Sequence, residues 1–312
     1  CITLVHAEED FAPSAKSAIL IDNGTGKILY EKNADEKLAP ASMTKIMSML
    51  LIMEAIDNGN ISLNDDIVIS KEAASMGGSQ VFLQEGETYK VSELLKGIAI
   101  ASGNDAVVAM AEKVGGTVSG FVDMMNNRAS ELGLQNTHFV NPHGLDAENH
   151  YSSARDMAIM AMELIKHEKI LEYSSIYEEY LTKNDGSKVW LVNTNKLVRF
   201  YSGTDGLKTG FTDTAGYCVT ATAKRNGLRL ISVVMNEPST DTRSEDTVKM
   251  LNYGFNSYKT NLIMEKNKSI GKVKVEKGKK EYVDVVLLND AQELLNINDK
   301  KKDYTFNILI DK

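Results

Sequence analysis

The sequence predicts an α+β fold in which an antiparallel sheet is flanked by helices. Strand-like alternation of apolar residues occurs near the N-terminus, at 17–33, and again at 206–223 and 228–237. Between these segments, residues 91–168 show the repeating apolar pattern of amphipathic helices. Because the strand-like segments lie on both sides of this region, the sheet must pair distant parts of the chain. We therefore expect one sheet with flanking helices, joined to an all-helical lobe.

The expected elements follow one another with recognisable boundaries. A β-hairpin turns at 23–26, and a helix runs over 42–56, where Asn58-Gly59 is a standard stop signal. After the later strands, residues 244–259 close the domain as a helix. The intervening helical region divides into four segments, 91–101, 104–114, 119–133 and 153–167.

The composition is that of an ordinary globular protein that is long enough for two domains. The chain has 312 residues, of which 43% are hydrophobic and 25% are charged. The formal charge of −8 and the pI of about 5.3 argue against a nucleic-acid-binding surface. No stretch reaches the roughly 18 unbroken apolar residues of a membrane span. Cys1 and Cys218 are the only cysteines, so neither a disulfide framework nor a cysteine-based metal site is expected.

Both ends of the chain differ in composition from its centre. Residues 1–10, CITLVHAEED, are apolar and then abruptly acidic, as at the end of an export signal. We expect residues 1–14 to be a residual signal and a linker; a lipidated Cys1 is the alternative. Residues 259–312 hold 12 Lys against 9 Asp and Glu, with short strand-like segments, which indicates a small β-rich C-terminal domain. These strands stop at Lys312 without a closing element, so we expect this domain to be cut short.

An ionisable lysine lies in the most apolar helical segment. Residues 43–56 carry Met, Ile or Leu around nearly the whole helix circumference, which is typical of a helix buried on all sides. Ser42 and Lys45 are three residues apart and can share one helix face. Burial and a cationic neighbour each lower a lysine pKa, and the neutral amine could take the serine proton. The helix N-terminus could then hold the oxyanion formed by serine attack on a carbonyl. The alternative is a capping Ser42 with Lys45 reaching water, because S-x-x-K recurs by chance.

Two further polar motifs occur within or between apolar segments. Ser102-Gly103-Asn104 lies between two helical segments, where a loop can direct polar side chains into a cleft; the alternative is a capped helix connection. Lys208-Thr209-Gly210 lies in a strand-like segment, where glycine permits close approach of another backbone or of a ligand; the alternative is an edge-strand lysine.

Together the three motifs resemble the signature of the penicillin-binding D-alanyl-D-alanine carboxypeptidases, the low-molecular-mass branch of the serine acyl-transferases. The segments GLQNTHFVNPHGLDAENHYSSARDMA and GTDGLKTGFTDTAGYCVTATA match that family nearly word for word. The resemblance covers roughly residues 15–258 and implies a β-lactamase/transpeptidase-like catalytic domain there. It implies that residues 259–312 begin the β-rich C-terminal domain of the family.

The resemblance assigns the acyl-transfer roles to individual residues. It makes Ser42 the acylated nucleophile and Lys45 the base that deprotonates it. Ser102 would relay a proton to the leaving D-alanine, while Asn104 holds the substrate amide and orients Lys45. The backbone N–H groups of Ser42 and Phe211 would form the oxyanion hole.

The resemblance also implies a subsite for the substrate carboxylate. Lys208 and Thr209 would bind the terminal carboxylate, and Gly210 would leave room for the substrate along the strand. Arg243 matches an arginine of the family near this site. Some relatives carry His where this chain has Phe211, so traits that depend on that histidine are not transferred to this chain.

The implied enzyme removes the terminal D-alanine from peptidoglycan pentapeptide stems through an acyl-serine that water hydrolyses, and penicillins acylate the same serine. It needs no cofactor and no metal. Its expected partners are peptidoglycan stem peptides and β-lactam antibiotics, and not nucleic acid. Relatives often end in an amphipathic helix on the membrane surface, and none is visible before Lys312. We expect an exported protein at the outer face of the cytoplasmic membrane or in the cell-wall space.

Three alternatives remain open at this point. A class A β-lactamase needs a deacylating glutamate, and the only one in the corresponding neighbourhood, Glu131, falls inside an expected helix. A metallopeptidase needs ligands at helical spacing, but the five histidines include no H-E-x-x-H. His138, His143 and His150 are expected to be structural, in a polar loop. A silent peptidoglycan-binding protein should lack a motif residue, and none is missing.

Overall fold

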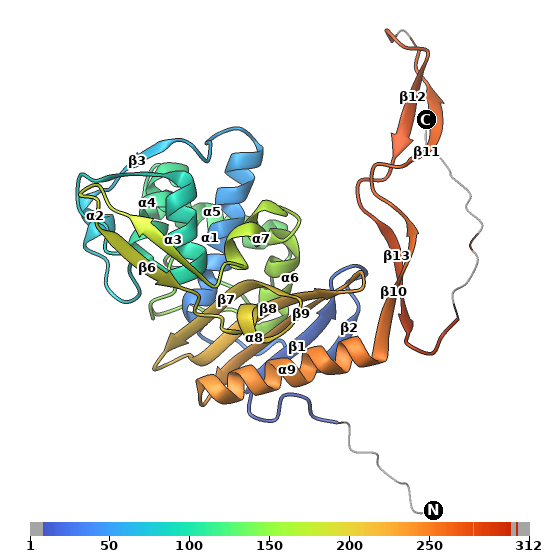
Figure 1. The fold of residues 1–312 in the computed structure, drawn as a ribbon, viewed down its shortest axis with the longest axis horizontal. Coiled ribbons are helices and arrows are strands. Elements are labelled where there is room, and N and C mark those ends of the chain that lie inside the picture. The colour runs from blue at the N-terminus through green and yellow to red at the C-terminus, as the bar shows by residue number, and fades with distance from the viewer. Residues whose placement is uncertain (1–8, 277, 301–303, 305–312) are drawn as a thin grey trace, which may run out of the picture.

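The computed structural model describes residues 9–276, 278–300 and 304. At the centre of the fold is a five-stranded antiparallel sheet with the strand order β2-β1-β9-β8-β7 (Figure 1). Strand β1 pairs with β9, more than two hundred positions away, so the sheet joins distant parts of the chain as predicted. The strands are β1 (Ser17–Asp22), β2 (Ile28–Lys32), β7 (Thr204–Thr212), β8 (Gly216–Arg225) and β9 (Leu228–Glu237).

Strand β1 is buried on both faces, which explains its nearly unbroken apolar sequence. Ile19 and Ile21 belong to the hydrophobic core that the sheet shares with the lobe helices. Ala18 and Leu20 belong to a second core, which the sheet shares with helix α9 (Thr240–Ser257). Successive side chains of a strand point to opposite faces. The sheet therefore separates two cores, with the helical lobe on one face and α9 on the other (Figure 1).

The lobe surrounds helix α1 (Lys45–Asp57), which is buried around nearly its whole circumference, as predicted. The helix begins at Lys45 instead of Ser42, because residues Ala41–Thr44 form a tighter 3₁₀ turn before it. It ends at the predicted stop signal, where Gly59 has a φ of +74°. The other helices are α2 (Lys71–Ala74), α3 (Val91–Ala101), α4 (Asn104–Gly115), α5 (Val118–Glu131), α6 (Ala154–Leu164), α7 (Lys169–Ser174) and α8 (Leu197–Phe200).

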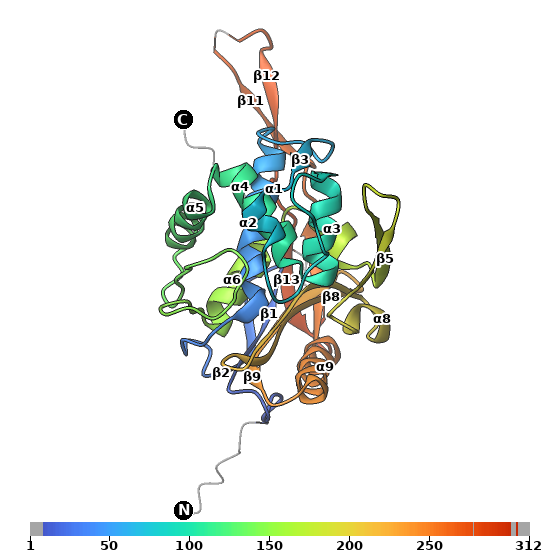
Figure 2. The ribbon, with the colours of Figure 1, turned by 90° about the vertical axis from the view of Figure 1, so that its left-hand side faces the viewer.

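The region 91–168 forms the predicted helices, and two short strand pairs that the sequence did not predict lie before and after it in the chain. Both pairs are antiparallel, and Figure 2 shows the second of them beside α3. Leu181 and Leu191 of the second pair are buried in the lobe core. Strands of three to five residues show too little alternation to be separated from loops in a helix-rich region. The pairs are β3 (Asp66–Val68) with β4 (Thr88–Lys90), and β5 (Glu178–Thr182) with β6 (Lys188–Val192).

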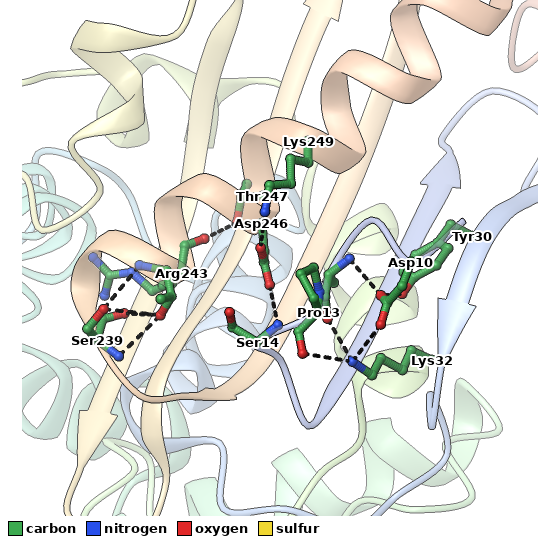
Figure 3. A network of polar contacts seen from close by, with 12 residues as sticks. Asp10, Pro13, Ser14, Tyr30, Lys32, Ser239, Arg243, Asp246, Thr247 and Lys249 are labelled. Atoms are coloured by element: carbon green, nitrogen blue, oxygen red, sulfur yellow. Dashed lines mark hydrogen bonds and ion pairs between the residues drawn. The ribbon is translucent and has the colours of Figure 1, made fainter. Parts of the chain in front are cut away.

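The segment before β1 packs against the domain, so it is not the linker expected up to residue 14. Phe11 stacks on Tyr253 of α9 with ring centroids 4.1 Å apart, and Ala12 is fully buried. The Ser14 N–H donates a 2.8 Å hydrogen bond to Asp246 of α9 (Figure 3). This segment therefore packs as part of the sheet domain, because its apolar side chains cover part of α9.

The C-terminal strands form two antiparallel pairs, which extend from α9 as an arm (Figure 1). They are β10 (Tyr258–Met264) with β13 (Ala291–Asn296), and β11 (Ser269–Lys274) with β12 (Tyr282–Val286). The predicted β-rich C-terminal unit is thus present. The expected signal residues, including Cys1, and most of the tail beyond residue 300 lie outside the described residues. Within the described part of the chain, no helix is long and apolar enough to cross a membrane.

Candidate active site

The 3₁₀ turn Ala41–Thr44, which carries the motif serine, is held between two glycines. A Cβ atom at Gly210 of β7 would lie 2.7 Å from the Pro40 carbonyl oxygen. A Cβ atom at Gly144, in the loop before α6, would collide with the Ala41 carbonyl. Neither position can carry a side chain unless the turn moves. The glycine of K-T-G therefore permits close approach of another backbone, namely the turn that carries Ser42. Its predicted role in leaving room for substrate along the strand stays a prediction.

Lys45 is fully buried, and its amine makes three hydrogen bonds. Its Nζ lies 3.0 Å from Ser42 Oγ, 2.7 Å from Asn104 Oδ1 and 2.8 Å from the His143 carbonyl oxygen. The amide and carbonyl oxygens can only accept, so they occupy two N–H groups of the amine. The third position of the nitrogen faces Ser42 Oγ, and in a neutral amine this position is the lone pair. The geometry thus directs the basic electron pair of Lys45 at the serine hydroxyl.

The electrostatic surroundings of Lys45 favour the neutral amine. Burial lowers the pKa of Lys45 well below its usual value, and the positive charge of Lys208 lowers this pKa further. The nearby Asp105 carboxylate acts in the opposite direction. Ser42 itself is only partly buried. The site therefore combines an accessible hydroxyl with a base that is shielded from water.

Ser102 and Asn104 come from the junction between α3 and α4. Ser102 ends α3 with a left-handed φ of +63°, and Asn104 is the first residue of α4. Asn104 Nδ2 donates to the Gly77 carbonyl at 2.7 Å, which leaves Oδ1 for Lys45. Ser102 Oγ is buried and has no hydrogen-bond partner among the described residues. Buried hydroxyls are normally paired, so this one is free to bond to a bound ligand.

Asp105 was missed by the sequence reasoning, although it directly follows Asn104. Its carboxylate accepts hydrogen bonds of 2.9–3.1 Å from the backbone N–H groups of Val81, Leu83 and Ala106. These bonds tie the loop before β4 to the first turn of α4, and hence to the position of Asn104. An acidic residue at a helix N-terminus was the available signal.

Lys208 and Arg243 bring two buried cations close together. Burial, followed by the charge of Arg243, lowers the pKa of Lys208 to about 7. Lys208 Nζ donates to the Thr209 carbonyl at 2.9 Å. Burial also lowers the pKa of Arg243, whose guanidinium has no hydrogen bond or ion pair with any described residue. Two buried cations without a carboxylate partner in the described part of the chain strongly attract an anion.

The remaining motif residues lie on β7. Their side chains make no direct hydrogen bonds to Ser42, Lys45 or Asn104 among the described residues. The Thr209 hydroxyl donates to Thr194 Oγ1 at 2.7 Å, and Thr194 is a further residue that the sequence reasoning did not single out. Phe211 is 50% exposed, and its ring lies 4.4 Å from the Tyr217 ring of β8. The structure thus joins Ser42, Lys45 and Asn104 through hydrogen bonds of the Lys45 amine. The side chains of the other predicted residues have no hydrogen bond to these three among the described residues.

The histidines in the loop before α6 are structural, as predicted. His150 Nδ1 accepts a 3.0 Å hydrogen bond from the Val140 N–H, and its Nε2 lies 2.8 Å from Thr44 Oγ1. His143 contributes its backbone carbonyl to Lys45. Burial lowers the pKa of both His143 and His150 to about 4, so both rings are neutral near pH 7. Their shared effect is to attach this loop to the turn that carries Ser42.

Comparison with known proteins identifies the family. Residues 4–239 match the family model described as D-alanyl-D-alanine carboxypeptidase. The chain belongs to the D-alanyl-D-alanine carboxypeptidase family. It is 52% identical over 298 residues to the carboxypeptidase DacF of Bacillus subtilis, covering 94% of this chain and 77% of that relative. It is 42% identical over 253 residues to the carboxypeptidase DacA of Escherichia coli K12, covering 79% of this chain and 62% of that one.

Solved structures of penicillin-binding proteins share the fold of this carboxypeptidase. Penicillin-binding protein 5 from Haemophilus influenzae matches with a TM-score of 0.80 at 34% identity, covering 94% of this chain and 85% of that one. Penicillin-binding protein D2 from Listeria monocytogenes, solved in the ampicillin-bound form, matches with a TM-score of 0.69 at 34% identity. That match covers 78% of this chain and 98% of the other. The catalytic fold predicted from the three motifs is confirmed.

Proposed function

We propose that this chain removes the terminal D-alanine from peptidoglycan stem peptides by serine acyl transfer, with Ser42 as the nucleophile. The observation that supports it best is the 3.0 Å contact between Lys45 Nζ and Ser42 Oγ inside a buried site. The family and its penicillin-binding relatives supply the class of reaction. Geometry and family therefore agree on a serine carboxypeptidase.

In the first step, Ser42 Oγ bonds to the carbonyl carbon of the penultimate D-alanine while its proton passes to the lone pair of Lys45. Asn104 Oδ1 and the His143 carbonyl hold the amine in the required direction. Collapse of the tetrahedral intermediate breaks the peptide bond, and the leaving D-alanine amine takes the proton held by Lys45, for which Ser102 Oγ is the proposed relay. Water then attacks the acyl-serine carbonyl, loses a proton to Lys45 and releases the shortened stem peptide, and the proton returns to Ser42 Oγ. Backbone N–H groups of Ser42 and Phe211 are the proposed oxyanion donors.

The carboxylate of the departing D-alanine fits the cationic pair. Lys208 and Arg243 are both buried and have no carboxylate partner among the described residues, so a substrate carboxylate would complete their charge balance. Thr209, next to Lys208, can add a hydroxyl hydrogen bond. A substrate that ends in a free carboxylate is thereby preferred, which is the requirement of a carboxypeptidase.

The β-lactamase alternative lacks support in the structure. Glu131 is the last residue of α5, and its carboxylate pairs with Arg128 at 3.1 Å on the exposed side of the helix. It therefore cannot activate a deacylating water beside Ser42. We infer slow release of bound penicillin, and the acyl-enzyme should accumulate.

Location and domain limits belong to the same proposal. Action on peptidoglycan places the working enzyme outside the cytoplasm, and the outer face of the cytoplasmic membrane or the cell-wall space is the proposed site. Attachment to the membrane surface would come from a C-terminal anchor. The proposed catalytic domain ends where α9 passes into β10 at Tyr258, and it begins before residue 15, because the preceding segment packs on α9.

Labelling with a fluorescent penicillin tests the proposed nucleophile. The wild-type protein and the Ser130→Ala variant, which loses an exposed serine, should form a labelled band. Ser42→Ala should form none and should release no D-alanine from a pentapeptide. Labelling of Ser42→Ala at the wild-type rate would refute the assignment.

A further inference from the structure

Glu237 is a buried carboxylate that the proposed chemistry does not use. It ends β9 and is 1% exposed, and neither side-chain oxygen has a hydrogen-bond partner among the described residues. It pairs with Tyr217 in the β8–β9 register and borders a cavity of about 560 Å³ that Phe211 of β7 also lines. An unpaired buried carboxylate is costly when ionised, so a glutamate in this position calls for a physical explanation.

A second buried carboxylate lies close to Glu237. Asp246 of α9 accepts hydrogen bonds from the Ser14 N–H at 2.8 Å and from Lys249 Nζ at 3.1 Å (Figure 3). Burial first, and the nearby Asp246 carboxylate in addition, raise the pKa of Glu237 to about 7. Two adjacent carboxylates do not ionise independently. With two hydrogen-bond donors at Asp246 and none at Glu237 in the described part of the chain, Glu237 is the carboxylate whose charge has no local compensation.

Arg243 is the cation that responds to the charge of Glu237. It lies on α9 one turn before Asp246, and its side chain points away from Asp246 (Figure 3). The charge of an ionised Glu237 acts on the guanidinium of Arg243. Arg243 in turn acts on the Lys208 amine. One electrostatic chain therefore runs from Glu237 through Arg243 to the proposed carboxylate subsite.

The lysines around Glu237 are already paired. Lys16 pairs with Glu36, Lys32 with Asp10, and Lys249 with Asp246. Burial raises the pKa of the Cys218 thiol to about 11, so the thiol stays neutral near pH 7. The groups around Glu237 come from four parts of the fold: Lys16 before β1, Lys32 of β2, Asp213, Tyr217 and Cys218 in and before β8, and Thr242, Arg243, Asp246 and Lys249 of α9.

We propose that Glu237 is a positioning residue that sets the carboxylate affinity of the Arg243 subsite by keeping or losing its proton. The inference rests on the proposed function, in which Arg243 meets the substrate carboxylate. With Glu237 protonated, the charge of Arg243 is available to the substrate. When Glu237 releases its proton to solvent, its negative charge acts on the Arg243 guanidinium and weakens the attraction of that guanidinium for the substrate carboxylate. The enzyme then binds anionic substrates less well as the pH rises through neutrality.

The test compares benzylpenicillin with its methyl ester, because only the free acid needs the cationic subsite. The measured quantity is the acylation rate with benzylpenicillin divided by the acylation rate with its methyl ester, followed between about pH 5.5 and about pH 8.5. As the pH rises over this range, the ratio should fall roughly fivefold further in the wild type than in Glu237→Gln. A factor of this size is expected from one partly screened charge. The smaller fall that remains in Glu237→Gln belongs to Lys208. Glu245→Gln removes an exposed charge from the same helix and should behave as the wild type.

A second readout does not depend on catalysis. A carboxyl with a raised folded-state pKa stabilises the fold below its unfolded-state value of about 4.5, and this contribution is lost as the pH rises through about 7. The melting temperature of the wild type should therefore fall over this range relative to that of Glu237→Gln. Identical pH profiles of the rate ratio or of the melting temperature in both proteins would overturn the inference. A wild type acylated by neither compound would instead contradict the proposed function.

Discussion

Asn104 Oδ1 accepts a 2.7 Å hydrogen bond from Lys45 Nζ, joining the first residues of α1 and α4 across 59 positions of sequence. The bond does more than link two helices. Together with the His143 carbonyl it uses two of the directions around the nitrogen, so the third must face Ser42. The direction of the basic lone pair is therefore decided by two residues that take no proton themselves.

Replacing this amine should abolish acylation while keeping the fold. Lys45→Met has a similar length and no basic nitrogen, so acylation by a fluorescent penicillin should fall by about 10³-fold or more. The melting temperature should change modestly. Replacing a buried amine by an apolar side chain stabilises the fold, and this gain offsets the cost of leaving two acceptor oxygens without a donor. Lys113→Met, at an exposed lysine, is the matched control. Near-normal acylation by a folded Lys45→Met would exclude lysine as the base.

Asp105 should act through the loop that it holds. In Asp105→Asn, one carboxylate oxygen becomes an N–H₂ group that faces the backbone N–H donors of Val81 and Leu83. We expect a loss of about 2–4 kcal/mol in the free energy of unfolding, measured by urea denaturation. Asp123→Asn, at an exposed site on α5, should change this free energy by less than about 0.5 kcal/mol. Equal stabilities of the two variants would show that the loop is held by other contacts.

A methyl group at Gly210 should displace the turn that carries Ser42. Its Cβ would lie 2.7 Å from the Pro40 carbonyl and 3.2 Å from the Met43 N–H nitrogen. A shift of about 1 Å at a nucleophile costs roughly 10²-fold in rate, and we expect that loss of kcat in Gly210→Ala. Gly271→Ala in β11 adds the same methyl in open space and should leave kcat unchanged. Full activity of Gly210→Ala would mean that the turn adjusts without consequence.

The carboxylate affinity should also follow the charge of Lys208. Its pKa of about 7 means that the ammonium form is present below that pH and is lost above it. The KM for a peptide ending in a carboxylate should be constant at acidic pH and rise above about pH 7. Folding favours the neutral amine, so the stability contributed by Lys208 increases as the pH rises from about 7 to about 10.5.

The Glu237→Gln background isolates this effect from that of Glu237. There, Lys208→Arg keeps its charge to higher pH, so it should remove the alkaline rise in KM. A flat KM between about pH 6 and about pH 9 in the Glu237→Gln protein would contradict a role for the Lys208 charge in binding.

Much of the fold could be predicted because its signals are local. The 91–101 helix has the predicted bounds, and the strands around 206–237 follow the alternation of the sequence closely. The short pairs β3–β4 and β5–β6 were missed because three to five residues carry little periodicity. The segment before β1 was misjudged as a linker, because its packing on Tyr253 and Asp246 depends on residues more than two hundred positions away.

The sequence by itself determined the motif residues, the apolar surroundings of Lys45 and the order of the elements, because side-chain chemistry and periodicity are properties of neighbouring residues. Only the tertiary structure decided the direction of the Lys45 lone pair, the partners of Asp105 and the burial of Glu237 without a hydrogen-bond partner among the described residues. These properties depend on hydrogen bonds, burial and charge between segments that meet only when the sheet and the lobe close on one another. The chemical identity of a side chain is fixed at one position of the sequence, whereas its pKa and orientation depend on the residues that the fold brings near it.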